Sequence, residues 1–296
     1  MPIVLILVLF IGNINFSQPL NNSADIFFAP IKKNSESIGI AVSAKSVLAI
    51  DKKSDKILFA KNQDKILPIA SITKLMSVLV LLDKDLDWQR EVKIQKKDKR
   101  IGGRVYLGYG EVATVENLLN LALVASDNQA IIALIRSAGF SEQEFVDLMN
   151  EKTDKIGMLK TKFFDPTGLD LRNVSTVKDL TKLAKEIFNH QKIIDILSKK
   201  EYSFETLKNK KFHRVFSTNK LLKNVDENYS LQFGKTGHLD EAGYCFLTQA
   251  VDSKGNEIII AALGSDSDFN RFQEMKGLIV WVFENWEWES NAYMSF

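Results

Sequence analysis

Apolar and β-branched residues gather in short runs at both ends of the chain, and these runs predict strands. Residues 38–50 and 56–60 flank a polar turn, which is the pattern of a hairpin. Two later runs, 243–250 and 257–263, are separated by turn-forming residues at 252–256. We expect these four runs to form one antiparallel sheet.

The middle of the chain and its last part have helical spacing. Thr114 is a candidate N-cap, and Ser141 with Glu144 has the spacing of a capping box, as has Thr176 with Asp179. The helices predicted from these signals are 75–82, 114–125, 141–155, 180–188 and 268–286. Strands therefore come first and last with helices between them, which predicts an α+β domain with a helical subdomain inserted between the N- and C-terminal strands.

The N-terminus begins with a separate apolar run. Residues 1–12 have the length of a signal h-region and precede a polar stretch at 13–23, although no Lys or Arg stands before the run. The run is short for a membrane-spanning helix, and a buried strand or core helix is the alternative. We expect residues 1–18 to be a signal or N-terminal anchor and 19–36 a linker. The protein is then exported to the periplasm or cell-wall space, either released or tethered by an uncleaved N-terminal segment.

Composition excludes several classes of function. The chain has 296 residues, with 39 basic and 37 acidic side chains and a net charge of +2, so it lacks the basic excess of a nucleic-acid-binding protein. Short lysine clusters, such as 96–99 and 208–211, are typical of solvated surfaces. The single cysteine, Cys245, allows no intrachain disulfide, and three scattered histidines predict no metal site. We expect no cofactor.

The first chemical motif is Ser71-Ile-Thr-Lys74. On a helix, residues i and i+3 share a face, so the Lys74 amine can act as a base for the Ser71 hydroxyl if the amine is neutral. A neighbouring cation would lower the pKa of such a lysine. Two other matches, at 175–178 and 217–220, weaken the motif. Only Ser71 follows a Pro68-Ile-Ala segment and precedes a long apolar helix, which favours it as the nucleophile.

Two further triplets follow in order. Ser126-Asp-Asn128 lies between two apolar helical stretches, where it is either a plain helix cap or a proton relay, Ser126, beside a substrate-orienting amide, Asn128. Lys235-Thr-Gly237 is either an edge-strand lysine before a turn or a grip for a substrate carboxylate, with Gly237 allowing close approach. The ordered set S-x-x-K, S-D-N and K-T-G is described for penicillin-binding proteins and class A β-lactamases.

With these motifs the sequence resembles the low-molecular-weight penicillin-binding proteins, the D-alanyl-D-alanine carboxypeptidase/endopeptidase family of serine DD-peptidases. Residues 68–76, 165–169 and 235–243 carry the resemblance, which covers about 36–290. It implies a DD-peptidase/β-lactamase-like fold. It assigns to the active site Ser71 as nucleophile, Lys74 as base, Ser126 as relay, and Asn128, Lys235, Thr236, Gly237 and His238 as substrate-binding residues. Backbone N–H groups of Ser71 and His238 are implied as the oxyanion hole.

The resemblance implies a D-Ala-D-Ala carboxypeptidase that acts on peptidoglycan stem peptides and is covalently inhibited by β-lactams. Many relatives have Gly at the position of Asp127, whereas Asp also occurs in endopeptidases, so cross-link cleavage stays open. We expect a catalytic domain at 37–290 with no C-terminal β domain and no anchor after Trp286, and a membrane contact only through the N-terminal segment.

Other serine enzymes fit the sequence less well. A β-lactamase also needs a deacylating glutamate after the second triplet. Glu116 precedes Ser126, and the stretch 160–170 has no Glu, so β-lactamase ranks lower. A non-enzymatic wall-binding protein of the same fold is disfavoured because every triplet residue is present. A Ser-His-Asp hydrolase is disfavoured because no G-x-S-x-G motif occurs.

Overall fold

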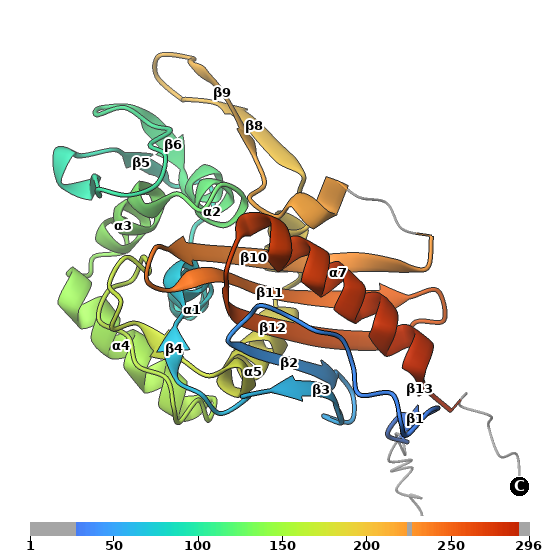
Figure 1. The fold of residues 1–296 in the computed structure, drawn as a ribbon. Helices are drawn as coiled ribbons and strands as arrows, with labels where there is room; N and C mark the ends of the chain where they lie inside the picture. The colour runs from blue at the N-terminus through green and yellow to red at the C-terminus, as the bar shows by residue number, and fades with distance from the viewer. Residues whose placement is uncertain (1–27, 224–226, 290–296) are drawn as a thin grey trace, which may run out of the picture.

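The computed structural model describes residues 28–223 and 227–289, and its centre is a five-stranded antiparallel sheet (Figure 1). The strand order is β10-β11-β12-β2-β3. The strands are β2 (Ser46–Asp51), β3 (Ile57–Lys61), β10 (Tyr229–Leu239), β11 (Gly243–Asp252) and β12 (Glu257–Ser265). The pairing of β12 with β2, which sets Ile260 opposite Ala49, joins the two ends of the chain as the sequence predicts.

Both faces of the sheet are covered, so β2 is buried throughout and β12 is buried after its first residue. Successive side chains of a strand point to opposite faces. Ile258 and Ile260 accordingly pack under α7 (Asp268–Asn285), while Ile259 and Ala261 pack in the core of the helical layer. Figure 1 shows α7 lying across one face and the other helices behind and beside the sheet.

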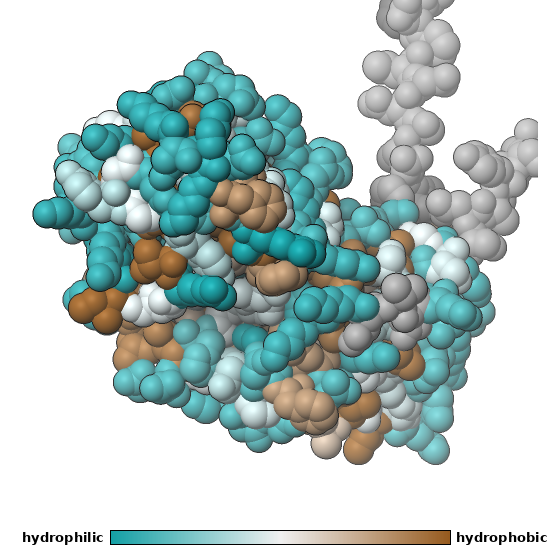
Figure 2. All heavy atoms as spheres, turned by 90° about the horizontal axis from the view of Figure 1, so that it is seen from above, coloured by the Kyte–Doolittle hydropathy of each residue, from teal (hydrophilic) through white to brown (hydrophobic). Residues whose placement is uncertain are grey.

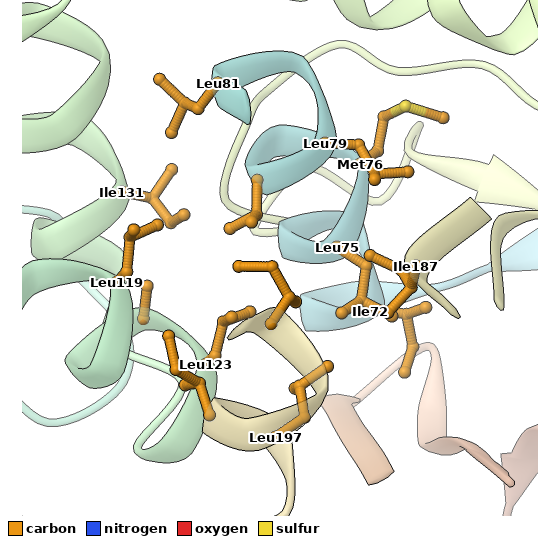
Figure 3. Packing of buried hydrophobic residues seen from close by; sticks show 14 of the residues in the cluster. Ile72, Leu75, Met76, Leu79, Leu81, Leu119, Leu123, Ile131, Ile187 and Leu197 are labelled. Atoms are coloured by element: carbon orange, nitrogen blue, oxygen red, sulfur yellow. The ribbon is translucent and has the colours of Figure 1, made fainter. Parts of the chain in front are cut away.

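The helical layer is built around α1 (Thr73–Leu82). Residues 73–81 are all buried, and Leu75 and Leu79 pack among side chains from the surrounding helices (Figure 3). Those helices are α2 (Val115–Val124), α3 (Asn128–Ser137), α4 (Glu142–Lys155), α5 (Val177–Phe188) and α6 (Gln191–Leu197). The segment that precedes Thr73 therefore leads directly into a helix that is buried along almost its whole length.

The predicted caps are present, with one difference. Thr114 Oγ1 accepts from the Asn117 N–H at 3.1 Å, and Ser141 and Glu144 form a complete capping box. At α5, Thr176 accepts from the Asp179 N–H, but Asp179 does not return the bond. Its carboxylate accepts from the Lys160 N–H at 2.8 Å instead, which ties α5 to the preceding loop.

The first predicted strand was too long, because residues 38–45 are not in a strand and β2 begins at Ser46. Three short pairs also lacked a prediction: β4 (Leu67–Pro68) with β7 (Val174–Ser175), β5 (Glu91–Lys93) with β6 (Val112–Thr114), and β8 (Glu201–Glu205) with β9 (Phe212–Phe216). These strands have two to five residues, and β8 and β9 alternate exposed and buried positions. Such short, half-polar runs give little periodic signal.

Part of the expected linker 19–36 is ordered in the structure. β1 (Ile31–Lys32) pairs with β13 (Trp286–Glu287), and the Trp281 Nε1–H donates to Ser37 Oγ at 3.0 Å. The packed domain thus begins before residue 37, because residues of this segment contact the end of α7. The expected signal or anchor at 1–18 lies outside the described residues. Across 28–223 and 227–289, no helix combines the length and hydrophobicity needed to cross a membrane.

Candidate active site

The three sequence motifs meet at one cleft between the sheet and the helical layer. Ser71 lies in the 3-10 turn η1 (Ala70–Ile72) directly before α1, and Ser126 lies between α2 and α3. Lys235 lies in β10. The cleft has a volume of about 700 Å³, and its lining includes Ser71, Ser126, Asn128, Thr236, Gly237 and His238. The face seen from above is mostly hydrophilic, with hydrophobic residues in scattered groups (Figure 2).

Lys74 touches Ser71 in the geometry of a general base. Its Nζ lies 2.8 Å from Ser71 Oγ, 2.6 Å from Asn128 Oδ1 and 2.7 Å from the Thr167 carbonyl oxygen. A neutral amine has two hydrogens and one lone pair. Lys74 can therefore donate to Asn128 and Thr167 while it accepts the proton of Ser71.

The electrostatics of Lys74 favour the neutral amine. Complete burial lowers its pKa to about 7, against the opposing effect of the nearby carboxylates of Asp165 and Asp127. The expected cause was a neighbouring cation, and the dominant cause is burial. A large fraction of Lys74 is thus unprotonated near neutral pH, as a base for Ser71 requires.

The second triplet is fixed by the start of α3. Asp127 is its N-cap and accepts from the Gln129 and Ala130 N–H groups at 2.8 and 3.2 Å. Burial raises the pKa of Asp127 to about 6 in spite of these bonds. This cap places Asn128 at the first position of α3, where its Oδ1 accepts from Lys74 Nζ. Its Nδ2 donates to the Gly102 carbonyl at 2.9 Å. This bond uses one of the two Nδ2 hydrogens, so the other can donate to a substrate carbonyl in the cleft.

Ser126 and Lys235 form a second hydrogen-bonded serine–lysine pair at the cleft, in addition to Ser71 and Lys74. Lys235 Nζ donates to Ser126 Oγ and to the Thr236 carbonyl, both at 2.8 Å, although Ser126 and Lys235 are 109 residues apart. Burial, then Lys74 and Arg271, lower the pKa of Lys235 well below its usual range. A carboxylate bound beside Lys235 would favour the ammonium form again.

Two glycines allow the sheet and a loop to approach the Ser71 peptide. Ala70 has φ +46°, a left-handed conformation that is strained for a residue with a side chain. A Cβ on Gly168 would lie 2.1 Å from the Ala70 carbonyl oxygen, and one on Gly237 would lie 3.1 Å from the Ser71 nitrogen. Gly168 and Gly237 therefore enclose the peptide that carries the nucleophile.

Sequence reasoning missed further residues at the cleft. Thr236 Oγ1 donates to Thr218 Oγ1 at 2.6 Å, and Arg271 of α7 donates from Nη1 to the Gly237 carbonyl at 3.0 Å. Gly102 and Tyr106 also line the cleft. No local pattern marks these residues. Gly168 had a signal, since it belongs to the 165–169 segment that carries the resemblance.

The two competing S-x-x-K serines are elsewhere. Ser175 is fully buried in β7, with its Oγ 2.7 Å from Thr161 Oγ1, and Ser217 accepts from the Asn219 N–H. Neither lines the cleft.

His238 lines the cleft from strand β10, and its ring stacks on the ring of Tyr244 with centroids 4.1 Å apart. No cluster of three metal-ligating side chains is found in the part of the chain that the structure describes.

The fold and these contacts define a serine acyl-transfer enzyme of the penicillin-binding type, in which a lysine one turn from the serine is the base. The sequence matches the family described as D-alanyl-D-alanine carboxypeptidase over residues 32–267, and the chain belongs to this family.

Three similar proteins illustrate the range of the family. A D-alanyl-D-alanine endopeptidase of Escherichia coli is 30% identical over 81% of this chain and 77% of its own length. The D-alanyl-D-alanine carboxypeptidase DacF of Bacillus subtilis is 32% identical over 86% of this chain and 65% of its own. The cefotaxime-bound structure of penicillin-binding protein D2 from Listeria monocytogenes has a TM-score of 0.72 and 29% identity, and covers 83% of this chain and 99% of its own. The predicted fold class and family are confirmed.

Proposed function

We propose that the protein is a serine-type D-Ala-D-Ala carboxypeptidase that acts on peptidoglycan stem peptides through an acyl-enzyme on Ser71. The observation that supports this most directly is the 2.8 Å contact between Ser71 Oγ and the buried Nζ of Lys74. A lysine with a pKa of about 7 can remove the serine proton at neutral pH.

The contacts suggest an order of events. Neutral Lys74 takes the proton of Ser71 Oγ, which attacks the carbonyl carbon of the penultimate D-Ala. The backbone N–H groups of Ser71 and His238 stabilise the oxyanion. Ser126, bonded to Lys235, passes a proton to the leaving amine and regains one from the Lys74 ammonium, so Lys74 is neutral again when terminal D-Ala departs. Water then attacks the ester and restores Ser71.

Peptide mapping after reaction with a fluorescent penicillin tests the nucleophile. We expect the label on the Ser71 peptide and none after Ser71→Ala, because Ser71 lies in the cleft with its hydroxyl 2.8 Å from the Lys74 amine. Ser175→Ala and Ser217→Ala are the matched controls and should label normally. A label on either of these serines, or on none, contradicts the proposal.

Cross-link cleavage is a second candidate activity. The E. coli relative is an endopeptidase, and Asp127 matches the residue that we associated with endopeptidases. Both reactions break the bond after D-Ala through the same acyl-enzyme, so they differ only in the size of the leaving group. Incubation with purified free pentapeptides and cross-linked dimers, followed by mass spectrometry, should show both being cut. Trimmed pentapeptides beside untouched dimers would exclude the endopeptidase activity.

A serine β-lactamase is the weaker alternative. Asp165 carries the only carboxylate of the 160–168 loop, and its Oδ1 accepts from Thr167 Oγ1 and the Gly168 N–H at 2.7 and 2.8 Å. Glu116 accepts from Gln89 Nε2 and does not line the cleft. Because Asp165 is held by its own loop and Glu116 lies outside the cleft, neither is placed to activate water, and we expect the penicilloyl ester to persist over many minutes. Rapid loss of the label would favour a β-lactamase.

We propose that the protein acts outside the cytoplasm. The apolar residues 1–12 and the location of the substrate in the wall support this. Cell fractionation with an antibody should find the protein in the periplasm or cell-wall space. Its presence only in the cytoplasm would contradict export.

A further inference from the structure

A strongly basic segment borders the cleft. Residues 93–104, named here the basic loop, contain six cationic side chains and one acidic one, and therefore carry a formal charge of +5. The whole chain has a net charge of +2, so its other residues together carry −3. The basic loop is thus positively charged while the remaining residues together are negatively charged. In the sequence alone, its lysine clusters resemble those of an ordinary solvated surface.

Most of these cations have no acidic partner. The loop's one carboxylate, Asp98, is fully buried and accepts from Arg136 Nε at 2.7 Å, and Arg100 pairs with Glu142. No ion pair in the described part of the chain involves the five other cations. They are Lys93, Lys96, Lys97, Lys99 and Arg104, and all are exposed.

The backbone of the basic loop is held in place beneath these side chains. Asp98 Oδ2 accepts from the Gln95 N–H at 2.7 Å, which closes a capping box over the short helix η2 (Lys96–Asp98). Arg136 Nη2 donates to the Lys93 carbonyl at 2.9 Å. The buried Asp98–Arg136 pair thus fixes the backbone, so the lysines are presented outward from an ordered turn.

The same loop reaches the cleft at one end and a surface hollow at the other. Gly102, Gly103 and Arg104 line the cleft that contains Ser71. A separate hollow of about 470 Å³ lies among the lysines at 93, 96 and 97 and the ring of Tyr109. The cleft and the lysine-lined hollow thus lie at the two ends of one loop with exposed cations, so an anionic polymer whose peptide enters the cleft has cationic side chains nearby.

We propose that the basic loop binds carboxylate groups of the peptidoglycan polymer and so docks the enzyme on the wall next to the bond that it cuts. This proposal rests on the proposed function, because the occupant is identified by the continuity of the loop with the catalytic cleft. Stem peptides carry free carboxylates beyond the terminal D-Ala, and these complement unpaired lysines at a short distance.

Binding to insoluble peptidoglycan sacculi tests the docking role. Full-length protein carrying Ser71→Ala, which prevents turnover, is compared with the same protein carrying Lys93→Gln, Lys96→Gln and Lys97→Gln. Exposed ion pairs contribute about 0.2–1 kcal/mol each, so three of them correspond to roughly 3- to 150-fold weaker binding. The difference should shrink as salt is raised, because ions screen exposed charges.

A charge-matched control separates docking from net charge. Lys53→Gln, Lys56→Gln and Lys254→Gln remove the same charge from the β2–β3 and β11–β12 turns, which lie at the opposite end of the molecule from β5 (Figure 1). This control should bind sacculi as the parent does. Amidation of the sacculus carboxyl groups should reduce parental binding to the level of the Lys93, Lys96 and Lys97 variant.

Several results would overturn the proposal. They are equal binding by the two triple variants, undiminished binding to amidated sacculi, and binding to phosphatidylglycerol vesicles or polyphosphate in preference to sacculi. With Ser71 intact, both triple variants should be acylated by soluble penicillin at the parental rate. Failure of that acylation in the parent would instead refute the proposed function, so the two failures are distinguishable.

Discussion

Lys74 lies in the first turn of α1, where its Nζ contacts one hydroxyl, one amide oxygen and one backbone carbonyl. Only the hydroxyl, on Ser71, can give a proton to the amine. Asn128 and Thr167 can only accept from it, so they orient the lone pair of the neutral amine toward Ser71. The hydrogen-bond partners and the burial of Lys74 therefore favour the same protonation state.

We expect acylation to be lost as the pH falls through about 7. A protonated Lys74 has no lone pair, so below its pKa of about 7 the acylation rate should fall about tenfold per pH unit, and above it the rate should level off. Stopped-flow measurement of penicillin acylation between pH 5 and 9 gives this profile. A flat profile across this range would argue against Lys74 as the base.

The charge of Asp127 should shift the pH dependence of the acylation rate. Its carboxylate raises the pKa of Lys74, so Asp127→Asn, which keeps an N-cap oxygen, should move the acid limb of the acylation profile to lower pH. Asp127→Ala also removes the cap and should cost about 0.5–2 kcal/mol of folding stability. Stopped-flow acylation and urea unfolding of both variants separate the two effects. If the acid limb of the acylation profile stayed at the same pH in Asp127→Asn, the Asp127 charge would have no effect on the pKa of Lys74.

The spacing of Ser71 and Lys74 in the sequence predicted that the two side chains would meet, and the structure places them 2.8 Å apart. The cause of the Lys74 pKa was not predictable, since burial depends on packing with distant elements. The same is true of Arg271 and Thr218, which reach the cleft from α7 and from the segment after β9. Their roles depend on tertiary contacts that leave no periodic trace in the chain.

At the scale of elements, η1 and α1 are held against the loop at 165–169. Ser77 Oγ donates to the Pro166 carbonyl at 2.6 Å, and Asn173 Nδ2 donates to the Asp165 carbonyl at 2.8 Å. Gly168 then packs directly on Ala70, the strained residue before the nucleophile. This loop is therefore expected to maintain the unfavourable conformation at Ala70.

Gly168→Ala should reduce acylation strongly. Gly168 has φ +88°, which costs an alanine about 1–2 kcal/mol, and the new Cβ would lie 2.1 Å from the Ala70 oxygen. Gly139→Ala is the control, because Gly139 has φ +91° and no atom within 4 Å of the Cβ position. Both variants should lose stability in urea unfolding, but only Gly168→Ala should also slow penicillin acylation at a concentration where it is folded. Equal acylation rates would refute the role of the loop.

Elements differed widely in how well the sequence predicted them. The helices with caps and four of the five strands of the sheet were predicted because each has a long apolar run or a local hydrogen-bonding signal. The fifth strand, β10, lay outside the four runs that we expected to form the sheet. The β5–β6 and β8–β9 pairs were not predicted, because each depends on a partner strand and on only one or two buried side chains per strand. In the proposed docking on the wall, β5 positions the basic loop, which starts at the last residue of this strand, Lys93.

At the scale of the molecule, the active site joins two packed layers. Ser71 and Asn128 come from the helical layer, and Lys235 comes from the sheet whose other face carries α7. The order of strands, helices and strands along the chain was sufficient to predict this architecture. The cleft therefore keeps its geometry only while the two cores, one on each face of the sheet, remain packed against it.

The two cores should unfold as one unit, and adjacent residues of β12 test this. Ile259 and Ile260 are both fully buried, the first in the helical core and the second under α7. Replacing either by Ala should cost about 2–5 kcal/mol, because each removes three methyl or methylene groups from a packed core. In urea, loss of helical circular dichroism and loss of penicillin labelling should coincide for both variants, with an unchanged slope. If Ile260→Ala lost part of its circular dichroism while labelling persisted, α7 and its core would be unfolding separately. Such a result would mean that the catalytic cleft is stabilised by the helical layer and the sheet without α7, and that the Arg271 contact to Gly237 is dispensable for acylation.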